Sequence, residues 1–157
     1  MSKFHSVAEA QLKLEYYCSY QERCHDEVVS KLKSMNMIPE AIDNIVVHLI
    51  ENNFLNEERF ACSFARGKHR IKFWGKVRIV NELKFRHISK YNIDKALKQI
   101  SPEEYEETFD KLAEQQWGNV RESNLLKKKK KVGDFLLRKG FESHLVYDKI
   151  KELETDS

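Results

Sequence analysis

Positive charge beside aromatic residues is the feature of this 157-residue sequence that is best suited to chemistry with a partner. The stretch KHRIKFWGKVRIVNEL, residues 68–83, contains five Lys or Arg residues, one histidine and the adjacent aromatic pair Phe73 and Trp74. Lysine and arginine bind phosphate and carboxylate groups, and an exposed aromatic ring can stack on a partner. The stretch therefore indicates a binding surface for an anionic partner.

Charge is divided unevenly along the chain, although the net charge is only +3. Residues 66–98 contain eleven basic and two acidic residues, whereas residues 101–122 contain seven acidic and two basic ones. Residues 125–140 are basic again, with seven Lys or Arg against Asp134. Two basic blocks separated by an acidic block create strong local fields, which act on partners rather than on the fold.

Other kinds of chemistry are not indicated by the sequence. The three cysteines Cys18, Cys24 and Cys62 form no CxxC pair, and the spacing of Cys18, Cys24 and His25 does not suit a closed tetrahedral metal site. We therefore expect reduced thiols and no metal. The sequence has no GxSxG, no HExxH and no phosphate-binding loop, so it predicts no catalytic residues, no enzyme activity and no cofactor.

Helices are the elements expected to position the cations. Five glycines and two prolines supply too few turn signals for an all-β protein of this length. Ser101 before Pro102 is typical of a helix N-terminus, and Glu104 is placed to complete a capping box. Pro39 and Asn56 mark two further helix starts.

No apolar run approaches the roughly 20 residues that span a membrane. The first residues, MSKFHSVAEAQLKLEYY, lack the apolar block of a signal peptide. We therefore expect a cytoplasmic protein without membrane contact.

Sliding the sequence against itself reveals an internal repeat with offsets of 51 and 53 residues. The matching apolar positions are Val28, Leu32, Met37, Ile42, Val46 and Leu49, then Ile79, Leu83, Ile88, Ile93, Leu97 and Ile100, and then Val132, Leu136, Phe141, Val146, Ile150 and Leu153. Each set predicts a helix ending near Asn36, His87 or Gly140, a short turn and a second helix. The segments that begin near Val7, Asn56 and Ser101 supply a third helix per unit.

The repeat predicts an all-α fold with three tandem three-helix, helix-turn-helix-like units in an elongated, curved, solenoid-like array. The expected boundaries are 1–55 for unit one, 56–100 for the basic unit two, and 101–157 for unit three, with an acidic first helix and a basic second helix. We expect a monomer.

Residues 59–89, RFACSFARGKHRIKFWGKVRIVNELKFRHIS, resemble the central segment of the RecX regulators of the RecA recombinase. The segment KKKKKVGDFLLRKGF, residues 127–141, is similar to the closing motif of that family. The resemblance implies tandem three-helix repeats and a non-catalytic protein that binds the RecA filament on DNA. It also implies inhibition of the recombinase, ATPase and co-protease activities of RecA in DNA repair and the SOS response.

The basic residues are the candidate contacts with the RecA filament or with DNA. Lys76, Arg78 and Arg86 align with Lys129, Lys131 and Lys139, whereas unit one has no cation at the equivalent positions. This recurrence favours a binding surface over mere solvation of helix faces. The complete candidate set is Arg59, Arg66, Lys68, Arg70, Lys72, Trp74, Lys76, Arg78, Arg86, Lys128, Lys129, Lys131, Arg138 and Lys139.

Two function classes remain open from the sequence. One is a regulator that binds the RecA filament, and the other is a trihelical DNA-binding module that acts independently of RecA. For Trp74 the sequence favours packing in the protein over stacking on a partner.

Overall fold

Helices account for all the regular secondary structure that the computed structural model describes, which comprises residues 6–156. This confirms the all-α prediction. The helices are α1 Val7–Tyr20, α2 His25–Ser34, α3 Pro39–Glu51, α4 Glu57–Lys72, α5 Lys76–Phe85, α6 Lys90–Leu97, α7 Pro102–Asn119, α8 Leu125–Lys139 and α9 Ser143–Asp156.

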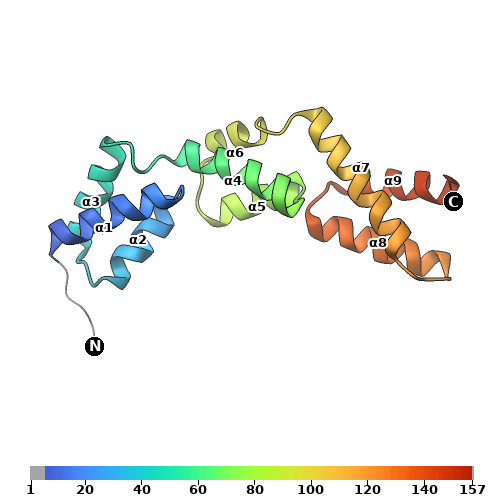
Figure 1. Cartoon of the computed structure of the whole chain (residues 1–157), viewed down its shortest axis with the longest axis horizontal. Coiled ribbons are helices and arrows are strands. Elements are labelled where there is room, and N and C mark those ends of the chain that lie inside the picture. The colour runs from blue at the N-terminus through green and yellow to red at the C-terminus, as the bar shows by residue number, and fades with distance from the viewer. Residues whose placement is uncertain (1–5, 157) are drawn as a thin grey trace.

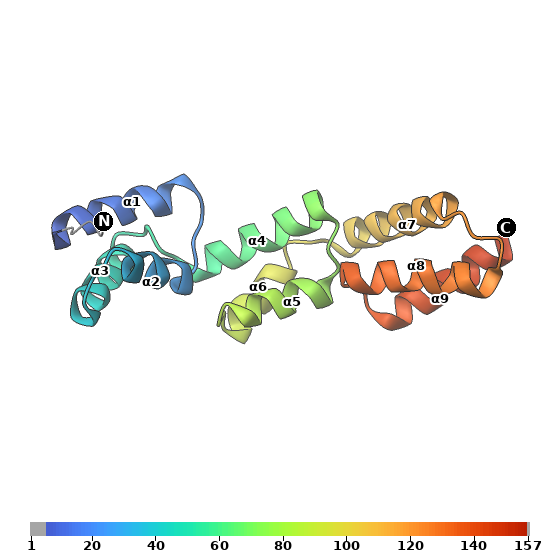
Figure 2. The same ribbon diagram turned by 90° about the horizontal axis from the view of Figure 1, so that it is seen from below.

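Within residues 6–156, nine helices form three successive units of three, which lie in a row and give this part of the chain an elongated shape (Figure 1). Within each unit the helices pack mainly on one another. Seen from below, α1, α4 and α7 follow each other along the row as the first helices of units one, two and three (Figure 2). Over residues 6–156, no helix combines the length and apolar character needed to cross a bilayer.

Side-chain caps start the first helix of every unit. Ser6, Asn56 and Ser101 each accept a hydrogen bond from the backbone N–H three residues later, at 2.9–3.1 Å. The carboxylate of Glu104, which the sequence places for a capping box, is instead bound by Arg70 of unit two. An ion pair between units has thus taken the place of a local cap.

The second helix of each unit ends in a left-handed residue, as the repeat predicts. Asn36, His87 and Gly140 have φ angles of 59°, 59° and 98°. This conformation is strained for side chains other than glycine, and asparagine tolerates it best among them. The turn geometry is therefore kept in all three units although only unit three has glycine there.

The repeated apolar positions form the core, with only Met37 and Leu97 partly exposed and the rest buried. Leu32, Leu83 and Leu136 are fully buried at equivalent places in the three units. The core is divided unequally. Unit one has its own cluster, whereas units two and three share one continuous cluster that also includes Cys24 of unit one.

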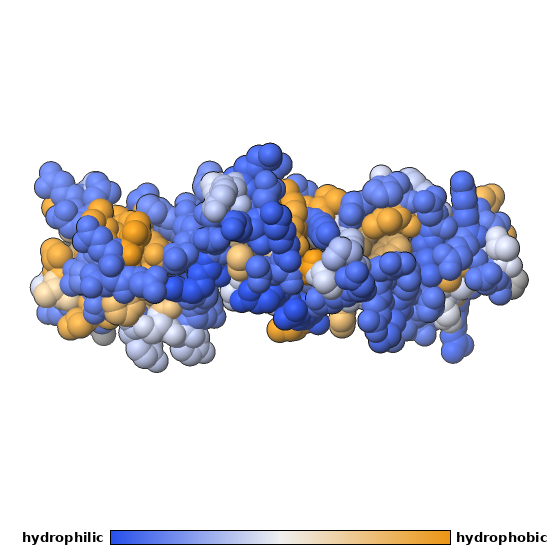
Figure 3. Space-filling model, turned by 90° about the horizontal axis from the view of Figure 1, so that it is seen from above, coloured by the Kyte–Doolittle hydropathy of each residue, from blue (hydrophilic) through white to orange (hydrophobic). Residues whose placement is uncertain are grey.

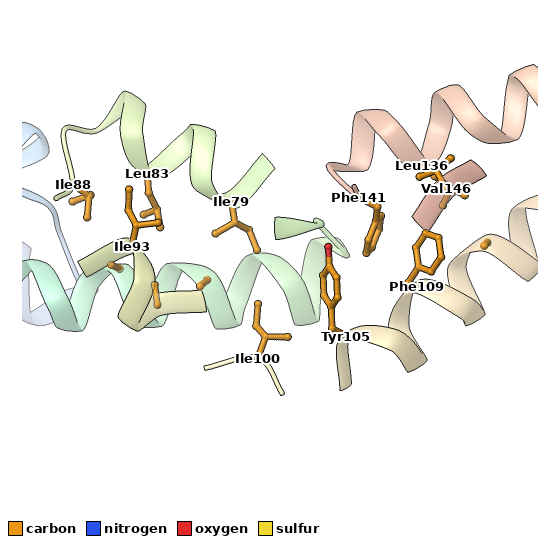
Figure 4. Packing of buried hydrophobic residues seen from close by; sticks show 14 of the residues in the cluster. Ile79, Leu83, Ile88, Ile93, Ile100, Tyr105, Phe109, Leu136, Phe141 and Val146 are labelled. Carbon is orange, nitrogen blue, oxygen red and sulfur yellow. The ribbon is translucent and has the colours of Figure 1, made fainter. Parts of the chain in front are cut away.

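Contacts between aromatic rings connect the part of the shared core in unit two with the part in unit three (Figure 4). The centroid of the Tyr105 ring lies 5.4 Å from that of His69 in unit two and 5.5 Å from that of Phe141 in unit three. Phe141 in turn lies 4.9 Å from Phe109, again between ring centroids. Such tilted contacts add stabilisation beyond burial of apolar area.

One lysine is buried in unit three and is neutralised locally. Lys149 is 5% exposed, and its Nζ lies 3.3–3.4 Å from carboxylate oxygens of Asp110, Glu114 and Glu152. Burial would lower the pKa of Lys149, but the hydrogen bond to Glu114 and the nearby carboxylate charges outweigh it and raise the pKa. The ammonium group is therefore a structural tie between α7 and α9.

A backbone contact between two glycines joins unit two to unit three. The N–H of Gly75 donates to the carbonyl of Lys139 at 2.7 Å, and the N–H of Val77 donates to the carbonyl of Gly140 at 2.9 Å. A Cβ on Gly75 would lie 2.4 Å from the carbonyl carbon of Gly140, and one on Gly140 would lie 2.2 Å from the Cβ of Arg78. Only glycine at both positions permits this approach.

We expect Gly140→Ala to destabilise the protein by about 2 kcal/mol or more, because it adds both a clash and left-handed strain. The matched control is Gly67→Ala inside α4, where no atom outside the helix lies within 4 Å. The control should be neutral or stabilising by about 0.5–1 kcal/mol. Chemical denaturation of both variants measures the difference, and equal stabilities would contradict the tight contact.

Candidate functional site

The glycine contact brings together cations that are far apart in the sequence. Lys139 donates from Nζ to the carbonyl of Lys72 at 3.0 Å, and Arg78 donates from Nη1 to the carbonyl of Arg138 at 3.2 Å. The end of α4, the start of α5 and the end of α8 therefore form one basic surface. We call Lys68, Lys72, Trp74, Arg78, Arg138 and Lys139 the junction cluster.

The indole of Trp74 is the aromatic centre of the junction cluster. It is partly buried, and it packs edge-to-face with the Phe64 ring, with centroids 6.1 Å apart. The guanidinium carbon of Arg78 lies 4.2 Å, and Nζ of Lys68 lies 5.0 Å, from the Trp74 ring centroid. Trp74 thus packs within the protein, and its ring holds two cations by cation–π attraction.

A buried histidine fixes the backbone that carries Trp74. His69 is fully buried, and its Nδ1 lies 2.9 Å from the carbonyl oxygen of Trp74, so Nδ1–H is the donor. Phe73 between them is left-handed, with a φ angle of 59°, and terminates α4. The sharp turn places Trp74 beside α5 instead of along the axis of α4.

Two cations of the junction cluster have side chains available to a partner. Lys72 and Arg138 are exposed, and within residues 6–156 neither side chain has an intramolecular hydrogen bond or ion pair. Their backbone carbonyls, by contrast, are both engaged at the junction. The backbone is therefore held in place while the two charged groups remain in solvent.

Two other predicted contact residues serve the junction as structural links. Arg70 donates to Glu104 at 2.8 Å, and this interaction holds the pKa of Glu104 below its usual range. Lys76 donates through its backbone N–H to the hydroxyl of Tyr105 at 3.0 Å, and that hydroxyl donates to Glu142. Burial, followed by the bond to Glu142, raises the pKa of Tyr105.

Three more of the predicted residues lie outside the junction cluster. Arg59 binds Glu22 and the Asn53 carbonyl, which ties unit two to unit one. Arg66 donates to Gln99 at 2.8 Å. Arg86 pairs with Glu82 at 2.9 Å, and its guanidinium carbon lies 4.9 Å from the Phe64 ring centroid. These three cations are engaged within the protein.

Three predicted lysines of unit three, Lys128, Lys129 and Lys131, lie apart from the junction cluster in the first half of α8, which begins near the C-terminal end of the row (Figure 1). Nζ of Lys128 lies 4.3 Å from the ring centroid of Trp117. Lys129 pairs with Glu154, and Lys131 with Glu122, both at 3.0 Å. The bond to Lys131 lowers the pKa of Glu122.

The junction between units one and two repeats the same design with different residues. Cys24 and His87 occupy the places of Gly75 and Gly140, and a hydrogen bond of 2.6 Å joins His87 to Asp26. Cys24 is buried in the core of unit two. Burial raises the pKa of the Cys24 thiol to about 11. In residues 6–156 no group of His, Cys, Asp and Glu side chains is arranged to hold a metal.

His69, Tyr105 and Glu142 were not identified as site residues from the sequence, because they shape the site but belong to no recognisable motif. The pair of glycines at 75 and 140 was a usable signal, because glycine is rare in this chain. Nothing in the sequence shows, however, that these two glycines touch each other.

Comparison with known proteins gives matches along most of the chain. Family models described as the second and the third three-helix domains of RecX match residues 56–97 and 103–150. The regulatory protein RecX of Limosilactobacillus reuteri (strain DSM 20016) is 31% identical over 145 residues, or 92% of this chain and 54% of that protein. The RecX of Geobacillus sp. (strain WCH70) is 28% identical, over 90% of this chain and 52% of its own. The chain thus spans about half the length of the curated relatives it matches.

Two solved structures share the fold. A crystal structure of a regulatory protein RecX has a TM-score of 0.75 and 30% identity, and the match covers 93% of this chain and 73% of that one. The crystal structure of RecX from Lactobacillus salivarius has a TM-score of 0.80 and 26% identity, with 95% and 97% coverage.

We expect Tyr105→Phe to destabilise the protein by about 1–3 kcal/mol, because it leaves the N–H of Lys76 and the carboxylate of Glu142 without their shared partner. Tyr91→Phe is the matched control, since that ring is 64% exposed. Urea denaturation compares the two, and a Tyr105→Phe variant as stable as the control would refute the role of the hydroxyl.

Proposed function

Because the chain belongs to the RecX family, we propose that it is a regulatory protein that binds the RecA nucleoprotein filament and inhibits RecA. The inhibited activities are the recombinase, ATPase and co-protease activities that serve DNA repair and the SOS response. The family resemblance supports the identity of the partner. The junction cluster supports the means of binding, because it gathers cations of two units on one rigid support.

The junction cluster suits an anionic filament for two physical reasons. The shared core and the backbone bonds between units two and three fix the cluster before binding, so little conformational freedom is lost on association. The free charges of Lys72 and Arg138 can then pair with phosphates of the bound DNA or with carboxylates of RecA. Both side chains are exposed to solvent, so a partner can reach them without any rearrangement of units two and three.

We also propose that the protein acts as a monomer in the cytoplasm and without catalysis of its own. The sequence supports the proposed lack of catalysis, since none of the nucleophile, metal or phosphate-binding motifs is present. Its effect on ATP hydrolysis would then be exerted on RecA.

We expect the double variant Lys72→Glu/Arg138→Glu to need at least tenfold more protein for half-inhibition of the DNA-dependent ATPase of RecA. Both side chains are exposed and free of internal partners, so stability should change by no more than about 1 kcal/mol. Lys33→Glu/Lys151→Glu is the control, because it changes the net charge equally at exposed positions elsewhere. Unchanged inhibition by the first variant would remove the junction cluster from the filament contact.

Binding to preformed RecA filament should exceed binding to naked single- or double-stranded DNA of the same length. Both should weaken as salt rises, because charge contacts are screened and counterions are released. Fluorescence anisotropy with labelled DNA, with and without RecA, measures both affinities. Equal affinity for naked DNA and filament would instead favour a DNA-binding module independent of RecA.

A further inference from the structure

Unit one carries an aromatic surface that the proposed function does not use. Leu12, Tyr16 and Tyr20 recur every four residues along α1, and their exposed fractions are 66%, 73% and 72%. They form one wall of a groove of about 470 Å³ between α1 and α2. Along the helix axis this wall extends for about 12 Å. We call this groove the tyrosine groove.

Cations surround the tyrosine groove. Tyr17 also lines the groove, and its ring centroid lies 3.7 Å from the guanidinium carbon of Arg23 and 5.8 Å from Nζ of Lys31. Lys13 also lines the groove. Arg23 is held by its bond to the Tyr17 carbonyl at 3.1 Å, which leaves the two lysines as the exposed charges.

The charges of unit one are strongly segregated. Residues 6–55 contain eight acidic and four basic residues. Three of those four basic residues line the tyrosine groove, and no acidic residue does. An otherwise acidic unit thus presents one positive, aromatic groove, which is the complement of a ligand that is both acidic and apolar.

We propose that the tyrosine groove docks a short acidic segment of a partner protein that carries apolar side chains. The apolar groups would lie on Leu12, Tyr16 and Tyr20, and the carboxylates would pair with Lys13 and Lys31. Aromatic residues flanked by cations are effective anchors for such segments because they lose little side-chain entropy on binding.

Electrostatic repulsion disfavours two other ligands for the tyrosine groove, namely single-stranded DNA and a second copy of this chain. A long polyanion such as single-stranded DNA could stack on tyrosines, but its flanks would cross the acidic surface of unit one. A second copy in a symmetric contact would place the groove lysines of the two copies against each other. A short acidic segment avoids both kinds of repulsion, because it is short enough to stay within the groove and its charge is opposite to that of the groove lysines. The inference is independent of RecA and of the junction cluster.

The test uses the whole protein and a fluorescein-labelled peptide of about twelve residues, about 18 Å as a helix. Leu or Phe recurs in it every three or four positions, and the remaining residues are Asp or Glu. We expect saturable binding by anisotropy. Tyr16→Ala/Tyr20→Ala and Lys13→Glu/Lys31→Glu should each weaken it at least tenfold, with unchanged circular dichroism. Tyr91→Ala/Tyr147→Ala, at two tyrosines that are 64% and 59% exposed elsewhere, should bind like the wild type.

Three results would overturn the inference. The first is no binding of the acidic peptide up to about 1 mM, or equal binding by the wild type and the groove variants. The second is binding of an oligothymidylate, but not of the peptide, that is lost in Tyr16→Ala/Tyr20→Ala. The third is a wild-type dimer in sedimentation that the same variant converts to monomer, which would assign the groove to a second copy.

Discussion

The contact between the backbones at Gly75 and Gly140 is the constraint on which the rest of the architecture depends. At that point the start of α5 and the end of α8 approach until a single Cβ would overlap a backbone or Cβ atom. Two N–H groups at the start of α5, those of Gly75 and Val77, are thereby satisfied by carbonyls of unit three. The first N–H groups of a helix and the last carbonyls of a helix have no partner within their own helix. Here the N–H groups at the start of α5 and the carbonyls at the end of α8 bond to each other.

The closeness of this approach explains why units two and three share a core while unit one keeps its own. At the equivalent place Cys24 and His87 carry side chains, so the contact between units one and two is made through side chains. Arg59 and Glu22 add an ion pair there. Charge pairs and the Cys24 side chain thus take the place of the backbone bonds, and apart from Cys24 the core of unit one is a separate hydrophobic cluster.

Unit one also differs from units two and three in the charge of its surface. Cations gather where units two and three meet, whereas unit one is acidic apart from the tyrosine groove. On the face shown in Figure 3, most of the molecule is hydrophilic, and apolar patches lie at the end formed by unit one as well as near the middle of the row and over unit three. The three units thus share one fold but differ in their exposed residues, because the repeat constrains only the buried positions.

The sequence by itself determined the helices, their threefold repetition and the buried positions, because apolar spacing and capping residues act within one helix or between neighbours. It also located the basic segments. Only the tertiary structure decided what each cation does. Arg70 formed an ion pair between units and Nζ of Lys76 lies 4.7 Å from the Tyr105 ring centroid, whereas the side chains of Lys72 and Arg138 stayed free. That outcome depends on which residues the fold brings together across 29 to 67 positions of the chain, and local patterns carry no record of such pairing.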